Sequence, residues 1–138
     1  AFLCHSHKDE ELAKGLQVML AENGLELYID WQDHEMPEQP NKETAARIKK
    51  KINDLDWFLF LATPNSSASR WCPWEIGIAD TRKDHERIII IPTTDSSGKW
   101  HGNEYLQLYN KIDLARGGGL ARFPADQKSS GTYIRYLK

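Results

Sequence analysis

The chain has 138 residues, 40% of them hydrophobic, which is enough for one globular domain with a buried core. A formal net charge of −2 and a pI near 6.2 argue against nucleic acid as a partner. The sequence has no apolar run of about 20 residues that would predict a membrane span, and its two cysteines lack the spacing of a disulfide scaffold. We therefore expect a single domain over residues 1–138, excised from a longer protein and located in the reducing cytoplasm, with no membrane or nucleic-acid partner.

From residue 1 to residue 52, short apolar segments alternate with segments of helical period. The pattern predicts a strand at Phe2–Cys4, a helix at Glu10–Glu22, a strand at Leu25–Ile29, a loop at Asp30–Asn41 and a helix at Lys42–Ile52. Asp9 is a candidate cap for the first helix, and Asn23-Gly24 is a typical C-terminal stop. The acidic loop has two prolines and no periodicity, which favours irregular structure.

The second part of the chain begins with a continuous apolar run, typical of a central strand buried on both faces. The pattern predicts a strand at Trp57–Ala62, a loop at Thr63–Ser69, a helix that contains Glu75, a strand at Ile88–Pro92, a loop at Thr93–Asn103, a short helix at Glu104–Tyr109 and a strand at Lys111–Leu114. Residues 116–119 are predicted to be flexible and the following residues, up to Ser130, to form a loop. Residues 133–138 form an amphipathic segment without a cap.

The alternation of strands and helices predicts the fold class. Helices of about ten residues between strands imply parallel pairing through right-handed crossovers. We therefore expect an α/β, flavodoxin-like three-layer sandwich with a central parallel sheet of about five strands. Such sheets bind their ligands at the carboxyl ends of the strands. The loops after Cys4, Ile29 and Ala62 should meet at that edge, together with the first turns of the Glu75 helix.

Glu75 is predicted to lie on the apolar side of its helix. At about 100° per residue, it falls within the arc formed by Trp71, Cys72, Trp74, Ile76, Ile78 and Ala79. A carboxylate is costly to bury without a partner, so Glu75 is a candidate catalytic group. The structural alternative is a glutamate that reaches solvent or stabilises the end of a helix.

The other candidate site residues are polar or aromatic side chains at the same edge of the sheet. They are Ser6, His7, Lys8, Asp30, Trp31, Asp33, Ser69, Trp71 and Trp74. Ser6 and Lys8 could bind a ribose or phosphate, or could simply turn the chain. Trp31 could be a lid, an interface residue or a local anchor. A zinc site made of the two cysteines with His5 and His7 is not expected, because alternate residues after a strand point to opposite sides; we expect no metal.

Three motifs resemble the Toll/interleukin-1 receptor (TIR) domain family. Phe2–Asp9 resembles its first-strand box, an apolar strand followed by Ser-x-x-Asp. Leu27–Asp30, with the loop after it, resembles the second strand and BB loop of that family. The most specific of the three is Ser69-x-Trp71-Cys72-x-x-Glu75, which is similar to the helix signature Trp-Cys-x-x-Glu. The resemblance covers about Phe2 to Pro92.

The long loop departs from the receptor members of this family. Many of them have Arg-Asp and Pro-Gly in the BB loop, whereas this chain has Gln32-Asp33 and Pro37-Glu38. Asp30-Trp31 and the Thr44-Ala45-x-x-Ile48 pattern look more like stand-alone prokaryotic TIR proteins. The departure weakens any transfer of receptor-adaptor pairing rules to this chain.

The resemblance to enzymatic TIR proteins implies that Glu75 cleaves NAD+ between nicotinamide and ribose. Nicotinamide leaves as a neutral molecule, so one carboxylate beside the developing oxocarbenium ion suffices. Trp71 and Trp74 would stack against adenine or nicotinamide and exclude water. NAD+ is then the substrate and no further cofactor is expected, while the choice between ADP-ribose and a cyclic ADP-ribose isomer stays open. The resemblance also implies immune or stress signalling, such as antiphage defence.

Two other functions remain as alternatives. One is a non-enzymatic module that assembles with other TIR domains through the BB loop and neighbouring helices. The other is an enzyme similar to nucleoside deoxyribosyltransferases, which would act on nucleosides rather than on NAD+. Catalysis and assembly are compatible, because the resemblance implies that self-association orders the BB loop and completes the site.

Overall fold

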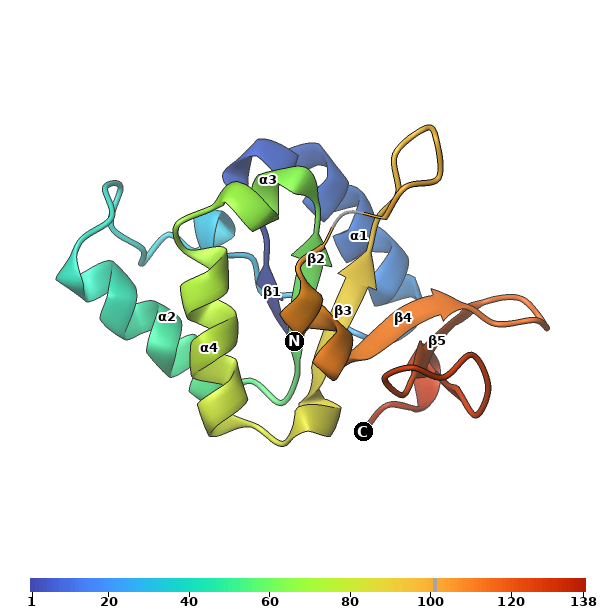
Figure 1. Ribbon diagram of the computed structural model, residues 1–138. Coiled ribbons are helices and arrows are strands. Elements are labelled where there is room, and N and C mark those ends of the chain that lie inside the picture. The colour runs from blue at the N-terminus through green and yellow to red at the C-terminus, as the bar shows by residue number, and fades with distance from the viewer. Residues whose placement is uncertain (101) are drawn as a thin grey trace.

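A mixed sheet forms the middle layer of the protein (Figure 1). The computed structural model describes residues 1–100 and 102–138. Within them the strands are β1 (Phe2–Cys4), β2 (Phe58–Ala62), β3 (Ile88–Pro92), β4 (Asn110–Leu114), β5 (Leu120–Phe123) and β6 (Thr132–Tyr133). They lie in this order across the sheet; β1 to β4 are parallel, and β5 and β6 extend the sheet in antiparallel fashion. The predicted flavodoxin-like α/β fold is confirmed, with six strands rather than five in the described residues.

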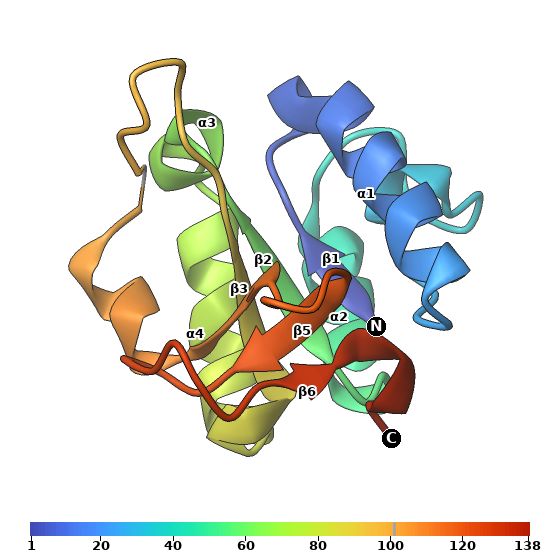
Figure 2. The same ribbon diagram turned by 90° about the vertical axis from the view of Figure 1, so that its right-hand side faces the viewer.

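Helices cover both faces of the sheet (Figures 1 and 2). The α-helices are α1 (Glu10–Glu22), α2 (Lys42–Asp54), α3 (Pro64–Ala68) and α4 (Cys72–Arg82), and the 3-10 helices are η1 (His7–Asp9), η2 (Asp30–Gln32), η3 (His85–Arg87), η4 (Glu104–Leu108) and η5 (Ile134–Tyr136). Helix α1 packs on one face, and α2 and α4 pack side by side on the other. No helix in residues 1–100 or 102–138 is long and apolar enough to span a membrane.

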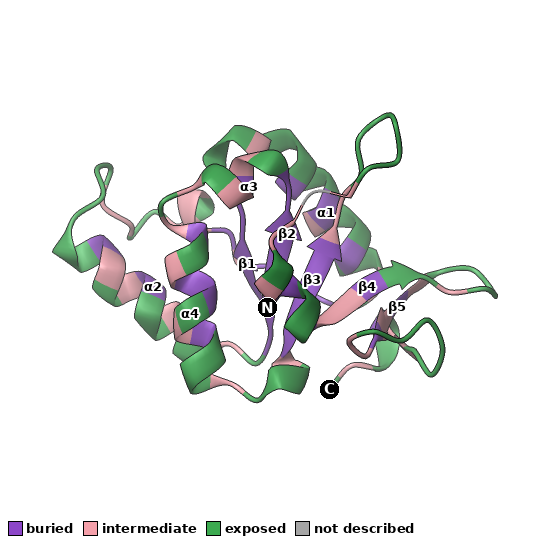
Figure 3. Cartoon of the chain, in the orientation of Figure 1, coloured by how far each residue is buried: buried purple, intermediate pink, exposed green. Residues whose placement is uncertain are grey.

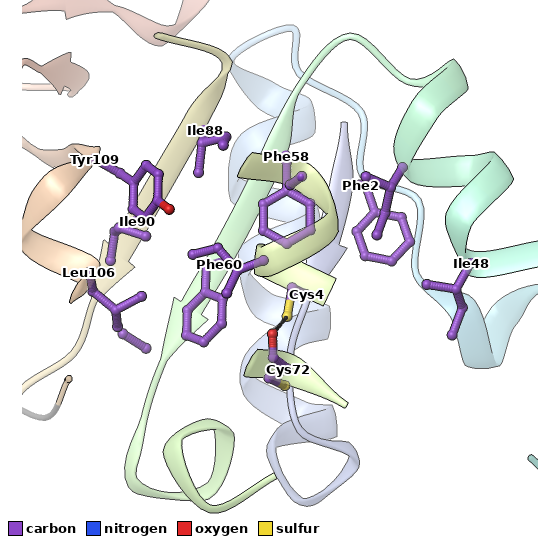
Figure 4. Close-up of a cluster of buried hydrophobic side chains, with 14 residues drawn as sticks. Phe2, Cys4, Ile48, Phe58, Phe60, Cys72, Ile88, Ile90, Leu106 and Tyr109 are labelled. Carbon is purple, nitrogen blue, oxygen red and sulfur yellow. Dashed lines mark hydrogen bonds between the residues drawn. The ribbon is translucent and has the colours of Figure 1, made fainter. Parts of the chain in front are cut away.

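Each face of the sheet buries its own half of the hydrophobic core. Phe58 and Phe60 of β2 belong to the cluster under α2 and α4, where Phe58 stacks on Phe2 with 5.6 Å between ring centroids (Figure 4). Leu59 and Leu61 belong to the cluster under α1, because successive side chains of a strand point to opposite faces. Figure 3 shows the result: β1 to β3 are buried, and the outer faces of the helices are exposed. The site loops therefore start from the most deeply buried part of the fold.

The segment predicted as a strand at Leu25–Ile29 is not a strand in the structure. It makes one parallel bridge to β1, in which the Tyr28 N–H donates to the Ala1 carbonyl at 2.7 Å and the Leu3 N–H donates to the Tyr28 carbonyl at 3.0 Å. The backbone then turns into η2, so no ladder can form. The segment still occupies the position of an edge strand next to β1.

The glycine-rich segment at 116–119, which was expected to be flexible, forms a tight hairpin turn. The Ala115 N–H donates to the Gly119 carbonyl at 2.9 Å, and Gly118 and Gly119 have φ angles of +85° and +82°, which glycine adopts without strain. The turn brings β5 back along β4, so the predicted loop up to Ser130 begins only after Phe123. The final residues, expected to be an amphipathic segment, form β6 and η5.

Two connections contain helical structure that differs from the prediction. The loop expected at Thr63–Ser69 contains α3, which starts with a capping box between Thr63 and Ser66 and with Pro64 in its first turn. The short helix expected at Glu104–Tyr109 is the 3-10 helix η4. In the loop expected at Thr93–Asn103, residue 101 lies outside the described residues.

Candidate active site

A cavity of about 710 Å³ opens at the carboxyl ends of β1 and β2. Its walls come from the β1–α1 loop, the long loop that starts at η2, the first half of α2, and the connection from β2 into α4. The predicted site residues that line it are Ser6, His7, Lys8, Asp30, Trp31, Asp33, Ser69, Trp71 and Glu75. Trp74 is absent from the described residues that line this cavity. The three loops that were expected to meet at one edge of the sheet do meet there.

Glu75 is positioned by the way in which α4 begins. Ser69 Oγ accepts hydrogen bonds from the backbone N–H groups of Trp71 at 3.2 Å and Cys72 at 3.3 Å, which fixes the start of the helix. Pro73 lies in the first turn, where its missing N–H costs no helical hydrogen bond. The Glu75 N–H then donates to the Trp71 carbonyl at 2.8 Å. The side chain of Glu75 therefore faces the sheet and the cavity floor, as the helical period predicted.

The Glu75 side chain is buried although it can carry a charge. The residue is 6% exposed, and this burial raises the pKa of its carboxyl well above the ordinary value. A hydrogen bond with the Cys4 thiol opposes the shift but does not cancel it. The negative form of Glu75 is thus poorly solvated, and a cation that enters the cavity would interact with it strongly.

The β1–α1 loop is tied to the β2–α4 connection by Asp9. Its carboxylate accepts hydrogen bonds from Thr63 Oγ1 at 2.5 Å and from Asn65 Nδ2 at 2.7 Å. Asp9 is the N-cap residue of α1, as predicted, but its side chain makes no capping hydrogen bond, because both oxygens are directed at these partners instead. Ser6 Oγ accepts from the Lys8 N–H at 3.3 Å and so starts η1. The loop therefore has a fixed shape at the cavity edge.

His7 and Asp30 form an ion pair across the mouth of the cavity, with 3.5 Å between Nε2 and Oδ2. The hydrogen bond to Asp30 raises the pKa of His7, although burial acts in the opposite direction. Burial raises the pKa of Asp30, but the hydrogen bond and charge of His7 outweigh it, so that the net pKa is lowered. Both shifts favour the charged pair.

The long loop is anchored at two points near its start. The Trp31 indole Nε1–H donates to His5 Nε2 at 2.8 Å, and the Lys14 ammonium lies 5.4 Å from the centroid of the Trp31 ring. The Tyr28 hydroxyl donates to the Asp33 carboxylate at 2.6 Å. Asp30, Trp31 and Asp33 thus reach the cavity, and all three also make contacts that shape the loop.

The two tryptophans of the α4 motif have different surroundings. Trp71 lines the cavity, while its ring meets that of Trp74 edge to face with 5.2 Å between centroids. Trp74 is partly buried against the α2 and α4 core, and the Lys49 ammonium lies 5.7 Å from its ring centroid. Trp74 thus contacts Trp71 without being among the described residues that line the cavity, and its predicted contact with substrate stays a prediction.

Sequence reasoning also missed residues that line the cavity. Among these are His34, Met36, Glu38, Thr44 and Asn65. Most belong to the long loop or the residues next to it, where the absence of periodicity gave no signal for which side chains turn inward. Asn65 had a readable signal, because the Thr-Pro pair before it is typical of a helix start. In the described part of the chain, no group of three or more His, Cys, Asp or Glu side chains is arranged to hold a metal ion.

Comparison with known proteins agrees with this fold and this motif. Residues 1–126 match the TIR domain family. The chain is also 33% identical over 112 residues to a Bacillus cereus (strain MSX-D12) protein named "Probable 3' cyclic ADP-D-ribose synthase ThsB'". That match covers 78% of this chain and 57% of the relative, so the chain spans little more than half the length of the relative. On the family match, the sheet and the motif around Glu75, the chain belongs to the TIR domain family.

Proposed function

We propose that the protein cleaves NAD+ between nicotinamide and ribose, and that Glu75 is its catalytic residue. The observation that carries the proposal is a buried carboxyl group, 6% exposed, which lines a cavity of about 710 Å³ and whose pKa is raised by burial. Perturbed carboxyl groups in clefts are typical of functional sites, because burial without purpose would destabilise the fold. The TIR relative from B. cereus supports the same class of reaction through its name.

The chemistry requires one well-placed negative charge. The bond from ribose C1′ to the nicotinamide nitrogen breaks, and its electron pair stays on nicotinamide, which leaves as a neutral molecule. Positive charge then develops on the ribose ring, and a carboxylate at Glu75 stabilises it while accepting hydrogen bonds from ribose hydroxyls. Trp71, which lines the cavity, provides an aromatic wall for one of the two bases. Trp74 would support that wall through its edge-to-face contact with Trp71.

The fate of the ribosyl cation decides the product. Water attack gives ADP-ribose, and attack by a hydroxyl of the same molecule gives a cyclic isomer; one proton is released in either case. The name of the B. cereus relative refers to 3' cyclic ADP-D-ribose. A cyclic isomer is therefore the product that we propose for this chain, with ADP-ribose as the product of competing water attack.

The test is NAD+ turnover with product identification by chromatography and mass spectrometry, at high protein concentration. Glu75→Gln keeps the shape of the side chain and removes its charge, and Glu22→Gln removes an exposed carboxylate from the end of α1 as the matched control. We expect nicotinamide release by the wild type and the control, and a loss of at least about 100-fold in Glu75→Gln. Turnover by Glu75→Gln at the wild-type rate would refute the role of Glu75.

Assembly with other TIR domains is the alternative if NAD+ is not consumed at all. Helix α1 has three exposed apolar residues for such contacts: Leu12 and Met19 at the edge of its buried side and Val18 on its outer side, with exposures of 48%, 41% and 61%. Sedimentation velocity over a range of concentrations tests this, with Val18→Glu expected to weaken any self-association. We further propose that the enzyme acts in the cytoplasm, where NAD+ is available, and that its product serves as a signal in immune or stress responses.

A further inference from the structure

His5 is a buried histidine whose two ring nitrogens both have partners. It is 7% exposed, and it follows β1 directly. Its Nδ1 lies 3.3 Å from the Leu3 carbonyl oxygen, and its Nε2 lies 2.8 Å from the Trp31 indole nitrogen. The second contact joins the β1–α1 loop to the start of the long loop, 26 residues further along the chain.

These partners determine the protonation state of His5. A carbonyl oxygen can only accept, so Nδ1 must carry the proton and donate it. An indole N–H can only donate, so Nε2 must be unprotonated to accept it. The neutral Nδ1–H tautomer satisfies both contacts. Protonation of Nε2 would instead bring two N–H groups face to face and break the contact with Trp31.

We infer that His5 is a positioning residue that holds Trp31 and the start of the long loop, which forms one wall of the cavity. Protonation of His5 Nε2 releases this contact. Beyond Trp31 that wall continues through Asp33, Met36 and Glu38, which all line the cavity. The consequence for substrate binding rests on the proposed function. The hydrogen bond and its response to pH do not depend on it.

The groups that face His5 act on it in both directions. Burial is the largest influence and lowers its pKa, which keeps the neutral form at neutral pH. The hydrogen bond to the Leu3 carbonyl and the carboxylates of Asp30 and Asp9 favour the charged form. His7, whose ring lies 6.0 Å from that of His5, opposes protonation when it is charged by its own pair with Asp30. The contact is therefore expected to hold at neutral pH and to open at a pH below the ordinary titration range of histidine.

The direct test follows the indole N–H signal of Trp31 by NMR of the ¹⁵N-labelled chain, with the signal assigned by its loss in Trp31→Phe. Between about pH 8 and about pH 4, a range that extends below the one in which ordinary histidines titrate, we expect this signal to move in one step in the wild type. In His5→Gln, whose amide oxygen can accept the same proton but does not titrate, the step should vanish. An indole signal that is insensitive to pH in the wild type, or that titrates unchanged in His5→Gln, would overturn the inference.

The kinetic test asks whether the contact matters for substrate. At neutral pH, His5→Leu should raise KM for NAD+ about fivefold, the factor that corresponds to about 1 kcal/mol for one hydrogen bond, with a smaller change in kcat. His5→Gln should restore KM, and His5→Leu should add nothing in a Trp31→Phe background, because the contact is already absent there. Equal effects of His5→Leu in both backgrounds would overturn the positioning role. If neither the wild type nor any variant consumes NAD+, the proposed function fails. The NMR titration still shows whether the contact between His5 and Trp31 exists and responds to pH.

Discussion

Glu75→Gln is expected to make the protein more stable while it abolishes NAD+ turnover. The Glu75 carboxyl is buried, and its pKa is raised well above the ordinary value of about 4.5, so ionisation is unfavourable in the folded state. Glutamine keeps the size and shape of the side chain and can never carry that charge. The substitution therefore removes a cost from the folded protein at neutral pH.

The pH dependence of the free energy of unfolding gives the magnitude of this stabilisation. Between the unfolded pKa and the raised folded pKa, the folded state holds a proton on Glu75 that the unfolded state has lost. The stability that Glu75 contributes is thus fully present below about pH 4.5 and decreases by about 1.4 kcal/mol for each pH unit above it, until the folded pKa is reached. Glu75→Gln lacks this decrease. Its advantage over the wild type should rise with that slope and then level off at the folded pKa.

The assay is urea unfolding of both proteins across this pH range, read as the difference in free energy of unfolding. The difference removes the contributions of all other titrating groups. Glu22→Gln controls for the loss of one negative charge, and its difference from the wild type should stay within about 0.5 kcal/mol at each pH. A constant difference between Glu75→Gln and the wild type would refute the reasoning about burial. So would a wild type that gains stability relative to Glu75→Gln as the pH rises.

Further substitutions test the hydrogen bonds beside the cavity and the backbone conformation of α1 and its end. Asp9→Ala removes an acceptor for two hydrogen bonds across the cavity edge and should lower the free energy of unfolding in urea by about 2–4 kcal/mol. Asp9→Asn should lower the free energy of unfolding by less. Equal effects of the two substitutions would contradict this account. Ser69→Ala removes the acceptor at the start of α4 and should cost about 1 kcal/mol, measured as a lower thermal midpoint; an unchanged midpoint would show that water replaces it. Gly24→Ala, at φ +82°, should destabilise by about 1 kcal/mol, whereas Gly15→Ala, in an exposed helical position with open space around it, should stabilise by a similar amount in the same melting experiment.

Regular periodicity and topology rules predicted most of what positions the site. Helix α1 has the predicted bounds because its apolar spacing ends at a glycine with positive φ. Glu75 is buried as its place in the helical period indicated. Strand β5 was missed because four residues are too short for a clear alternation, although glycines between two apolar segments are a hairpin signal that could have revealed it.

The contacts inside the site were beyond the reach of local patterns. Asp9 fits the rule for a helix cap, but partners 54 and 56 residues away compete successfully for its carboxylate. The contact between Trp31 and His5 depends on the relative placement of two loops, which no spacing rule contains. Sequence thus predicted the edge of the sheet at which the cavity lies, and the three-dimensional packing decides which side chains face it.

The register of the sheet has a consequence for how the protein folds. Strand β1 pairs with β2 through contacts such as Phe2 with Phe58, so closing this pair requires a loop of more than fifty residues, whereas β4 and β5 are joined by a short hairpin. The antiparallel edge can therefore form early, and the parallel half must wait for distant segments to meet. During synthesis, the cavity cannot assemble before β2 and α4 have left the ribosome. A nascent chain that ends before α4 therefore cannot consume NAD+ under the proposed function.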